Sequence, residues 1–394
     1  MPTSTAEPRV SRMCLSSTAM AHAAFVPTGM VTVMLGPLLP LLAARWSLND
    51  AQAGYLITAQ FLGSLLGTFA SGLLLPRLGF RSSVAVGQIL MALGVAGLIS
   101  AGFGLGGAAI FCYGVGIGIT IPAGNLMVAE IEPRRRSANL NLLNFSWSAG
   151  AIACPLALSL LQKMDGTKLF LRGIAGLLLV LTMILLLSPG ELRRPARTPP
   201  ASRGNLRSLR TAAAIQIGIL FFVYVGTENA LGGWLASYAK RINDSPAGVW
   251  MLVSSYFYGA LLLGRALAPV AARRLSDIAQ ACGGVVLGLA GSLVLLVSRS
   301  ASAIAVCAFL AGLGLSTLYP IAISLLASTF GAEARSIGGC MFALSTLGGA
   351  SLPWLVGFLS TELGSLRAGL LVPFVGCLVM LVIFTRARWR LVPA

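Results

Sequence analysis

Runs of about 18 or more apolar residues recur along almost the whole chain, separated by short polar or charged segments. A run of this length can cross the hydrocarbon core of a bilayer as one α-helix. The pattern predicts an all-α membrane protein with twelve transmembrane helices. We expect these helices at residues 17–43, 52–75, 83–104, 107–130, 138–161, 168–188, 212–238, 249–271, 279–298, 301–327, 337–360 and 366–385.

The longest polar stretch, residues 189–211, lies near the middle of the chain and is rich in Pro, Ser and Arg, as a flexible linker would be. It predicts three parts. Residues 1–188 form an N-terminal six-helix half, residues 189–211 form a basic cytoplasmic linker, and residues 212–394 form a C-terminal six-helix half.

An internal repeat supports the division into two halves. Gly114 and Pro122 recur 198 residues later as Gly312 and Pro320. Offsets of nearly the same size relate the apolar runs 52–75 and 249–271, and also 138–161 and 337–360. Two halves related by a pseudo-two-fold axis along the membrane normal are typical of transporters that bind their solute between the halves.

The distribution of positive charge predicts the orientation. Of the 28 Lys and Arg residues, 19 lie at the termini or in loops after even-numbered helices, and eight lie on the opposite side. Positive charge accumulates on the cytoplasmic side of membrane proteins, so both termini are expected there. We expect a monomer in a cell membrane, specifically a bacterial inner membrane. The cations lie between apolar segments and do not form a continuous basic stripe on a soluble surface, which argues against nucleic acid as a partner.

The composition also excludes several chemistries. Of the 394 residues, 57% are hydrophobic and only 10% are charged, and His22 is the single histidine. A histidine-based metal cluster or hydrolase triad therefore lacks its parts. No nucleotide-binding motif is present, because the glycine-rich stretch 104–107 follows no strand. We expect no cofactor and no enzymatic activity, so transport energy must come from an ion gradient or from the solute's own gradient.

One acidic residue, Glu228, lies deep within a predicted span. It is about 4–5 Å past the middle of the 212–238 helix. An ionised carboxylate is costly there, so it should face a cavity or find a partner. We interpret Glu228 as a proton-coupling residue; the alternative is a Glu bonded into helix packing. Glu130, at the predicted cytoplasmic end of the 107–130 helix, is the second candidate.

Arg265 is the one cation well inside a span, about 7–8 Å below the middle of the 249–271 helix. Its predicted vertical separation from Glu228 is about 12 Å, which argues against a direct salt bridge and leaves a water-linked pair. Its fork of donors could hold a carboxylate or sugar hydroxyls. Alternatively, it braces helix ends on the cytoplasmic side.

Further polar and aromatic side chains lie within the predicted spans. Asn141, Asn144 and Ser148 share one helical face, and amides and hydroxyls suit a polyhydroxylated solute. Hydrogen bonding between helices would explain the same residues, and ordinary packing would explain the aromatic ones. Together with Arg265, the candidate solute-binding residues are Gln60, Asn125, Asn141, Asn144, Trp147, Ser148, Tyr224, Tyr256 and Tyr319.

Gly72 through Arg81 lies between the second and third spans and resembles the loop G-x-L-x-D-R-x-G-R-R/K of the major facilitator superfamily. The resemblance covers essentially the whole chain and implies the major facilitator fold. It also implies a gating role for Gly72, Arg77, Gly79 and Arg81. Pro76 stands where that family has an acid that clasps neighbouring helices, and Phe80 stands at a basic position.

Within that superfamily, the chain looks most like the fucose-permease-like sugar–proton symporters. The residues that carry this likeness are Gly226 through Glu228, Gly233, Trp234, Tyr238, Gly264, Arg265, Asn125, Leu140 through Asn144, Gly150 and Ala151. The membrane-embedded acids of the fucose permease fall on Gly36 and Ile121 here, so the proton route should differ.

Three hypotheses follow. The first is a secondary transporter that moves a small, polar, sugar-like solute with protons by alternating access. The second is a proton-driven exporter of drugs or of a secreted metabolite, which a large apolar cavity would favour. The third, from another class, is a non-transporting membrane sensor, which would need a long soluble extension.

Overall fold

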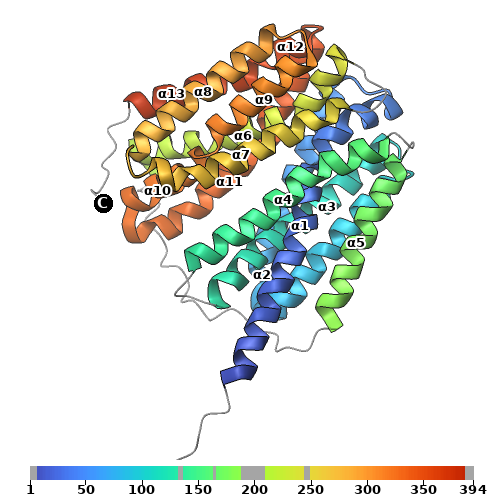
Figure 1. Cartoon of the computed structure of the whole chain (residues 1–394), viewed down its shortest axis with the longest axis vertical. Coiled ribbons are helices and arrows are strands. Elements are labelled where there is room, and N and C mark those ends of the chain that lie inside the picture. The colour runs from blue at the N-terminus through green and yellow to red at the C-terminus, as the bar shows by residue number, and fades with distance from the viewer. Residues whose placement is uncertain (1–6, 132–135, 163–165, 188–208, 244–248, 387–394) are drawn as a thin grey trace, which may run out of the picture. The chain divides into compact units, whose positions relative to one another are not determined.

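The computed structural model describes residues 7–131, 136–162, 166–187, 209–243 and 249–386. Every regular element in these ranges is a helix (Figure 1). The α-helices are α1 (Glu7–Trp46), α2 (Asp50–Gly97), α3 (Phe103–Ile131), α4 (Arg136–Gln162), α5 (Thr167–Leu187), α6 (Ala212–Ile242), α7 (Leu252–Ala271), α8 (Asp277–Val297), α9 (Ala301–Leu315), α10 (Leu318–Phe330), α11 (Ala334–Glu362), α12 (Leu366–Gly369) and α13 (Leu371–Arg386). Two short 3₁₀ helices, η3 (Val249–Met251) and η4 (Gly331–Glu333), precede α7 and α11.

Eleven helical segments in the described part of the chain are long and apolar enough to cross a membrane. They coincide with the predicted spans, except that the predicted span 52–75 and most of the predicted span 83–104 lie in α2, which consists of two helical stretches joined at a kink. The 48 residues of α2 correspond to about 72 Å of helical rise in total over its two stretches, more than twice the thickness of a hydrocarbon core. Its backbone leaves helical geometry at Gly79, where φ is 78° and ψ is 172°.

Some of the helices expose large apolar side chains, and such side chains form the surface that contacts lipid in a membrane. On α5, Val180, Met183 and Leu187 are each more than half exposed, whereas Leu171 and Leu178 on the same helix are buried. A helix that presents large apolar residues outward is suited to lipid rather than water. The buried face of α5 packs on α2, where the Thr182 hydroxyl donates to the Gln88 side-chain oxygen at 3.1 Å.

The chain divides into two compact units. Unit 1 comprises Met1–Thr32, Gly63–Cys154 and Thr167–Thr198, and unit 2 comprises Val33–Leu62, Pro155–Gly166 and Pro199–Ala394. The boundaries therefore fall inside α1, α2 and α4. The division into halves at 188 and 212 stays a prediction, and most of the predicted linker lies outside the described residues.

In unit 1, α1 packs closely on α4 and α2 packs closely on α3. A Cβ at Gly150 of α4 would lie 1.9 Å from the Val26 carbonyl oxygen, and one at Gly63 of α2 would lie 2.2 Å from that of Phe111. Only glycine allows two helix backbones to approach so closely, and such small-residue contacts are typical of membrane helices.

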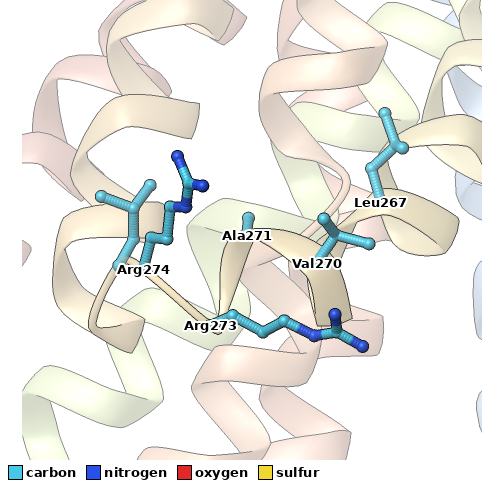
Figure 2. A pocket seen from close by; sticks show the side chains of 6 residues that line it. Leu267, Val270, Ala271, Arg273 and Arg274 are labelled. Carbon is cyan, nitrogen blue, oxygen red and sulfur yellow. The ribbon is translucent and has the colours of Figure 1, made fainter.

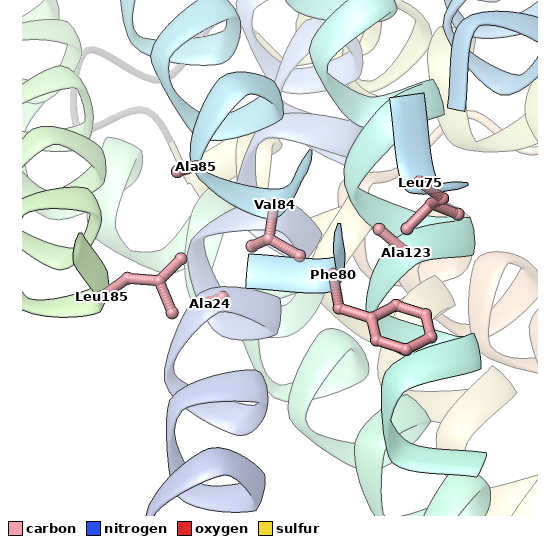
Figure 3. Packing of buried hydrophobic residues seen from close by; sticks show 7 residues of the cluster. All are labelled: Ala24, Leu75, Phe80, Val84, Ala85, Ala123 and Leu185. Carbon is pink, nitrogen blue, oxygen red and sulfur yellow. The ribbon is translucent and has the colours of Figure 1, made fainter. Parts of the chain in front are cut away.

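The bend at Gly79 is held by an apolar cluster in unit 1 (Figure 3). Phe80 is 2% exposed, next to Gly79, whose positive φ is readily adopted only by glycine. The cluster consists of Ala24, Leu75, Phe80, Val84, Ala85, Ala123 and Leu185. Phe80 therefore contributes to the core at a position where the family loop has a cation.

In unit 2, α6 packs most extensively on α11, and α9 lies between α7 and α8. The indole Nε1–H of Trp234 in α6 donates to the Pro353 carbonyl of α11 at 2.8 Å. That bond ties α6 to α11 within unit 2. The pair α6 and α7 carries the charged residues predicted from the sequence.

Candidate functional site

Glu228 of α6 and Arg265 of α7 form an ion pair within unit 2. The guanidinium Nη2 lies 4.0 Å from the carboxylate Oε1, and the side chains are 15% and 30% exposed. The expectation that a vertical offset of about 12 Å would prevent a direct pair is therefore wrong.

Side-chain direction explains the error. Consecutive spans such as α6 and α7 cross the membrane in opposite directions, and side chains on a helix lean toward its own N-terminus. Glu228 and Arg265 therefore lean toward each other from the two sides of the midplane. The long arginine side chain covers the rest of the offset.

Two tyrosines complete the cluster around this pair. Tyr224 lies one turn before Glu228 on α6, and its ring centroid is 5.7 Å from that of Tyr319 on α10. Both phenol groups are close enough to Glu228 and Arg265 to interact with them electrostatically. Tyr224 is 1% exposed, and its hydroxyl makes no close hydrogen bond within the described residues but lies near enough to Glu228 and Arg265 to interact with both. The buried Tyr224 hydroxyl is therefore part of the charged cluster rather than an isolated polar group.

A break between α9 and α10 supplies one more polar group. The Arg265 Nε–H donates to the Ser316 carbonyl at 3.4 Å. That carbonyl would normally accept from the backbone N–H four residues later, but residue 320 is a proline and has none. Sequence reasoning missed Ser316, although Pro320 was the signal that could have found it. Arg265 thus contacts both the Glu228 carboxylate and a backbone carbonyl between α9 and α10, and its role stays a prediction.

The candidate residues of unit 1 have a different environment. Asn141 and Asn144 are exposed on α4, and Ser148, on the same predicted face, is 4% exposed. The Asn144 amide donates to the Leu140 carbonyl at 3.0 Å, and the Asn125 amide of α3 donates to Ile121 at 2.9 Å. Each of these side-chain amides therefore donates to a backbone carbonyl of its own helix, and its side-chain oxygen can accept a hydrogen bond from another group.

The remaining candidates are Gln60, Trp147 and Tyr256. Trp147 of α4 donates from Nε1 to the Thr32 hydroxyl of α1 at 3.4 Å. Gln60 of α2 is 5% exposed, whereas Tyr256 of α7 is 50% exposed, so the two repeat-related positions differ in burial. Their assignment to a shared solute cavity stays a prediction.

The predicted gating residues surround the bend in α2. Gly72 and Arg77 are exposed, and Gly79 has the positive φ described above. The Arg81 Nε–H donates to the Leu185 carbonyl in the last turn of α5. A cation at a helix C-terminus satisfies an otherwise unpaired carbonyl and complements the helix dipole. Arg81 thereby ties α2 to α5 within unit 1; its role in gating stays a prediction.

A separate cavity of about 600 Å³ lies at the C-terminal end of α7 (Figure 2). Its lining contains none of the predicted solute-binding residues and consists of Leu267, Val270, Ala271, Arg273, Arg274 and Leu275. Within the described residues, no group of three or more His, Cys, Asp or Glu side chains could hold a metal ion.

The family follows from comparison with known proteins. The sequence profile of the Major Facilitator Superfamily matches residues 22–298. A protein of Brucella abortus biovar 1 (strain 9-941) named glucose/galactose transporter is 25% identical over 364 residues, covering 86% of each chain. The chain therefore belongs to the Major Facilitator Superfamily, which confirms the predicted membership and makes it a multi-pass membrane transporter rather than an enzyme.

Solved structures agree on the fold. A bacterial homologue of the human lysosomal transporter Spinster, in an inward-facing and occupied conformation, superposes with a TM-score of 0.77 at 13% identity, covering 96% of this chain and 97% of that one. The E. coli fucose:proton symporter superposes with a TM-score of 0.63 at 19% identity, covering 95% and 98% of the two chains. At these identities, the likeness concerns the fold alone.

Proposed function

We propose that this protein is a secondary active transporter that moves a small, sugar-like solute by alternating access, coupled to protons. The observation that carries the proposal is the charged cluster of Glu228, Arg265, Tyr224 and Tyr319 inside the membrane-spanning part of unit 2. Ionisable residues in such positions are costly and usually functional. The names of the sugar-transporting relative and of the fucose:proton symporter support the solute class and the coupling ion.

The cluster suggests how proton and solute are linked. A proton delivered to Glu228 neutralises the carboxylate and ends its attraction to Arg265. The guanidinium donors and the Tyr224 hydroxyl are then available to the hydroxyl groups of a solute. The exposed amides on α4 offer a donor and an acceptor of the same kind. Solute binding and protonation therefore favour each other, which is what symport requires.

The experiment is uptake into proteoliposomes, screened against a panel of hexoses, pentoses, polyols and nucleosides, with and without an inward proton gradient. We expect at least one polyhydroxylated solute to accumulate only when the gradient is present. Accumulation that is indifferent to the gradient would contradict proton coupling. Extrusion of an apolar dye without uptake of any sugar would favour the alternative, a proton-driven exporter.

We also propose that α2 crosses the membrane twice, giving twelve crossings, and that both termini are cytoplasmic in a bacterial inner membrane. The length of α2, its bend at Gly79 and the distribution of arginines support this topology. Ser202, in the predicted linker, lies outside the described residues. In Ser202→Cys, we expect an impermeant thiol reagent to react in inverted vesicles and not in intact cells. Reaction in intact cells would overturn the orientation.

A further inference from the structure

A second polar cluster lies at the start of α2, away from the site described above. Asp50, the first residue of α2, accepts two hydrogen bonds from Arg241 in the last turn of α6, one of them from Nη1 at 3.0 Å and the other from Nη2. The Ser360 hydroxyl of α11 donates to the same carboxylate. A two-point contact between guanidinium and carboxylate is the strongest geometry for such a pair. We call Asp50, Arg241, Ser360 and Thr361 the outer latch.

Backbone contacts join the same helix ends. The N–H of Ala51 is one of the four that the start of a helix leaves unpaired, and it donates to the Thr361 hydroxyl at 2.9 Å. A Cβ at Gly357 of α11 would lie 2.2 Å from the Asp50 carbonyl oxygen. The first turn of α2 therefore rests directly on the last turns of α11.

Close contacts continue along the helices beyond the latch. Ile57 of α2 packs on Gly233 of α6, where a Cβ would lie 2.8 Å from the isoleucine Cδ1. The Thr58 hydroxyl donates to the Ala350 carbonyl of α11 at 2.8 Å. A Cβ at Gly36 of α1 would lie 2.4 Å from the Gly232 carbonyl oxygen. Residues 33–62 are thus packed into unit 2 on both α6 and α11.

These contacts have properties suited to a gate that opens. They join parts of the sequence 191 and 310 residues apart, which the repeat assigns to different halves. Arg241 is 49% exposed, so its charge can be rehydrated when the pair separates. At Gly36 and Gly357, the contacts bring backbone against backbone. All four latch residues lie at helix ends that the charge distribution assigns to the non-cytoplasmic side.

We propose that the outer latch holds the non-cytoplasmic gate of this transporter closed and that Asp50 must release Arg241 and Ser360 in every transport cycle. The proposal rests on the alternating access and the orientation proposed above. It makes Asp50 a gating residue on the side opposite the predicted gating segment, Gly72 through Arg81.

The test measures access to a residue behind the latch. Ile57→Cys is introduced into a full-length background whose seven native cysteines are replaced, and intact cells are treated with an impermeant maleimide. The cysteine should react slowly when Asp50 is present. Adding Asp50→Asn removes the charge and should raise the labelling rate by about tenfold, the effect of losing one charge-assisted hydrogen bond.

Two variants control for other effects. Asp277→Asn removes an acid from the first residue of another helix, α8, and should leave the labelling of Ile57→Cys unchanged. The exchange Asp50→Arg with Arg241→Asp restores opposite charges and should return labelling toward the slow rate. Unchanged labelling in Asp50→Asn, with the protein still monodisperse, would overturn the proposal. Equal increases in Asp50→Asn and Asp277→Asn would also overturn it, because the effect would then be general destabilisation.

A cross-link provides an independent measurement. In Ala51→Cys with Thr361→Cys, oxidation should join α2 to α11, abolish transport and prevent labelling behind the latch, and reduction should restore both. Full transport by the cross-linked protein would show that this contact never opens. Because labelling needs no solute, a failed solute screen with a positive labelling result would reject the solute class and leave the latch standing.

Discussion

The candidate residues of the two units, predicted to couple protons or to bind solute, differ in how their polar atoms are satisfied. In unit 2, the charges of Glu228 and Arg265 are satisfied by each other, across two helices. In unit 1, the amides of Asn125 and Asn144 are satisfied within their own helices, by the carbonyls four residues earlier. Changing one member of the first group leaves its partner uncompensated, whereas changing a member of the second group affects one side chain.

This difference predicts which group performs which task. A pair of opposite charges changes its interactions strongly when one member takes up a proton, so it suits energy coupling. A neutral amide with a free carbonyl oxygen changes little with pH and suits recognition of hydroxyl groups. We therefore expect substitutions in unit 2 to change the driving force and stability, and those in unit 1 to change affinity.

The largest expected effect is that of Glu228→Gln, which mimics the protonated form at nearly the same shape. It should keep solute binding and exchange across the membrane and lose accumulation driven by a proton gradient. Counterflow and gradient-driven uptake in the same proteoliposomes measure the two properties. A variant that still concentrates solute against its gradient would remove Glu228 as the coupling residue, and Glu130 would be examined next.

Arg265→Ala should destabilise the protein, because it leaves the Glu228 carboxylate without its cation. We expect a loss of about 1–3 kcal/mol, less than the 3–5 kcal/mol typical of fully buried pairs because both side chains are partly exposed. Thermal unfolding in detergent measures it. Adding Glu228→Gln to Arg265→Ala should recover part of the loss, since no unpaired charge remains. Additive losses in the double variant would contradict a direct interaction.

Asn144→Ala should weaken solute affinity by about two- to tenfold, the effect of losing one hydrogen bond worth about 0.5–1.5 kcal/mol. The matched control is Asn229→Ala on α6, which removes the same kind of bond to a carbonyl four residues earlier. The control should leave affinity unchanged. If both variants unfold more readily and neither changes affinity, the amides serve helix packing.

The smallest expected effect is that of Tyr224→Phe. The hydroxyl is buried beside Glu228 and Arg265 without a close hydrogen bond in the described structure, so its removal should change thermal stability by less than about 1 kcal/mol. Solute affinity should fall about twofold if the hydroxyl contacts the solute, as measured by binding at equilibrium. A marked loss of stability would mean that the hydroxyl has a structural role.

The apolar runs were sufficient to predict the helical membrane fold, because span length is fixed by bilayer thickness. They could not reveal that Glu228 and Arg265 meet, since that depends on side-chain direction and not on position along each helix. Pro320 indicated a free carbonyl at Ser316 but not the donor that would reach it. The contact between Asp50 and Ser360 was beyond sequence reasoning, because nothing local to either residue specifies a partner 310 positions away.

That separation also has a consequence for biosynthesis. Ribosomes add about 5–20 residues per second, so Asp50 is made roughly 15–60 seconds before Ser360. During that interval, residues 33–62 at the ends of α1 and α2 exist without the α11 surface that later covers them, and in its first part also without α6, which ends at Ile242. A nascent chain interrupted within this window would present these ends, uncovered, to membrane proteases and insertion factors. Quality control could therefore distinguish unfinished from finished protein by residues 33–62.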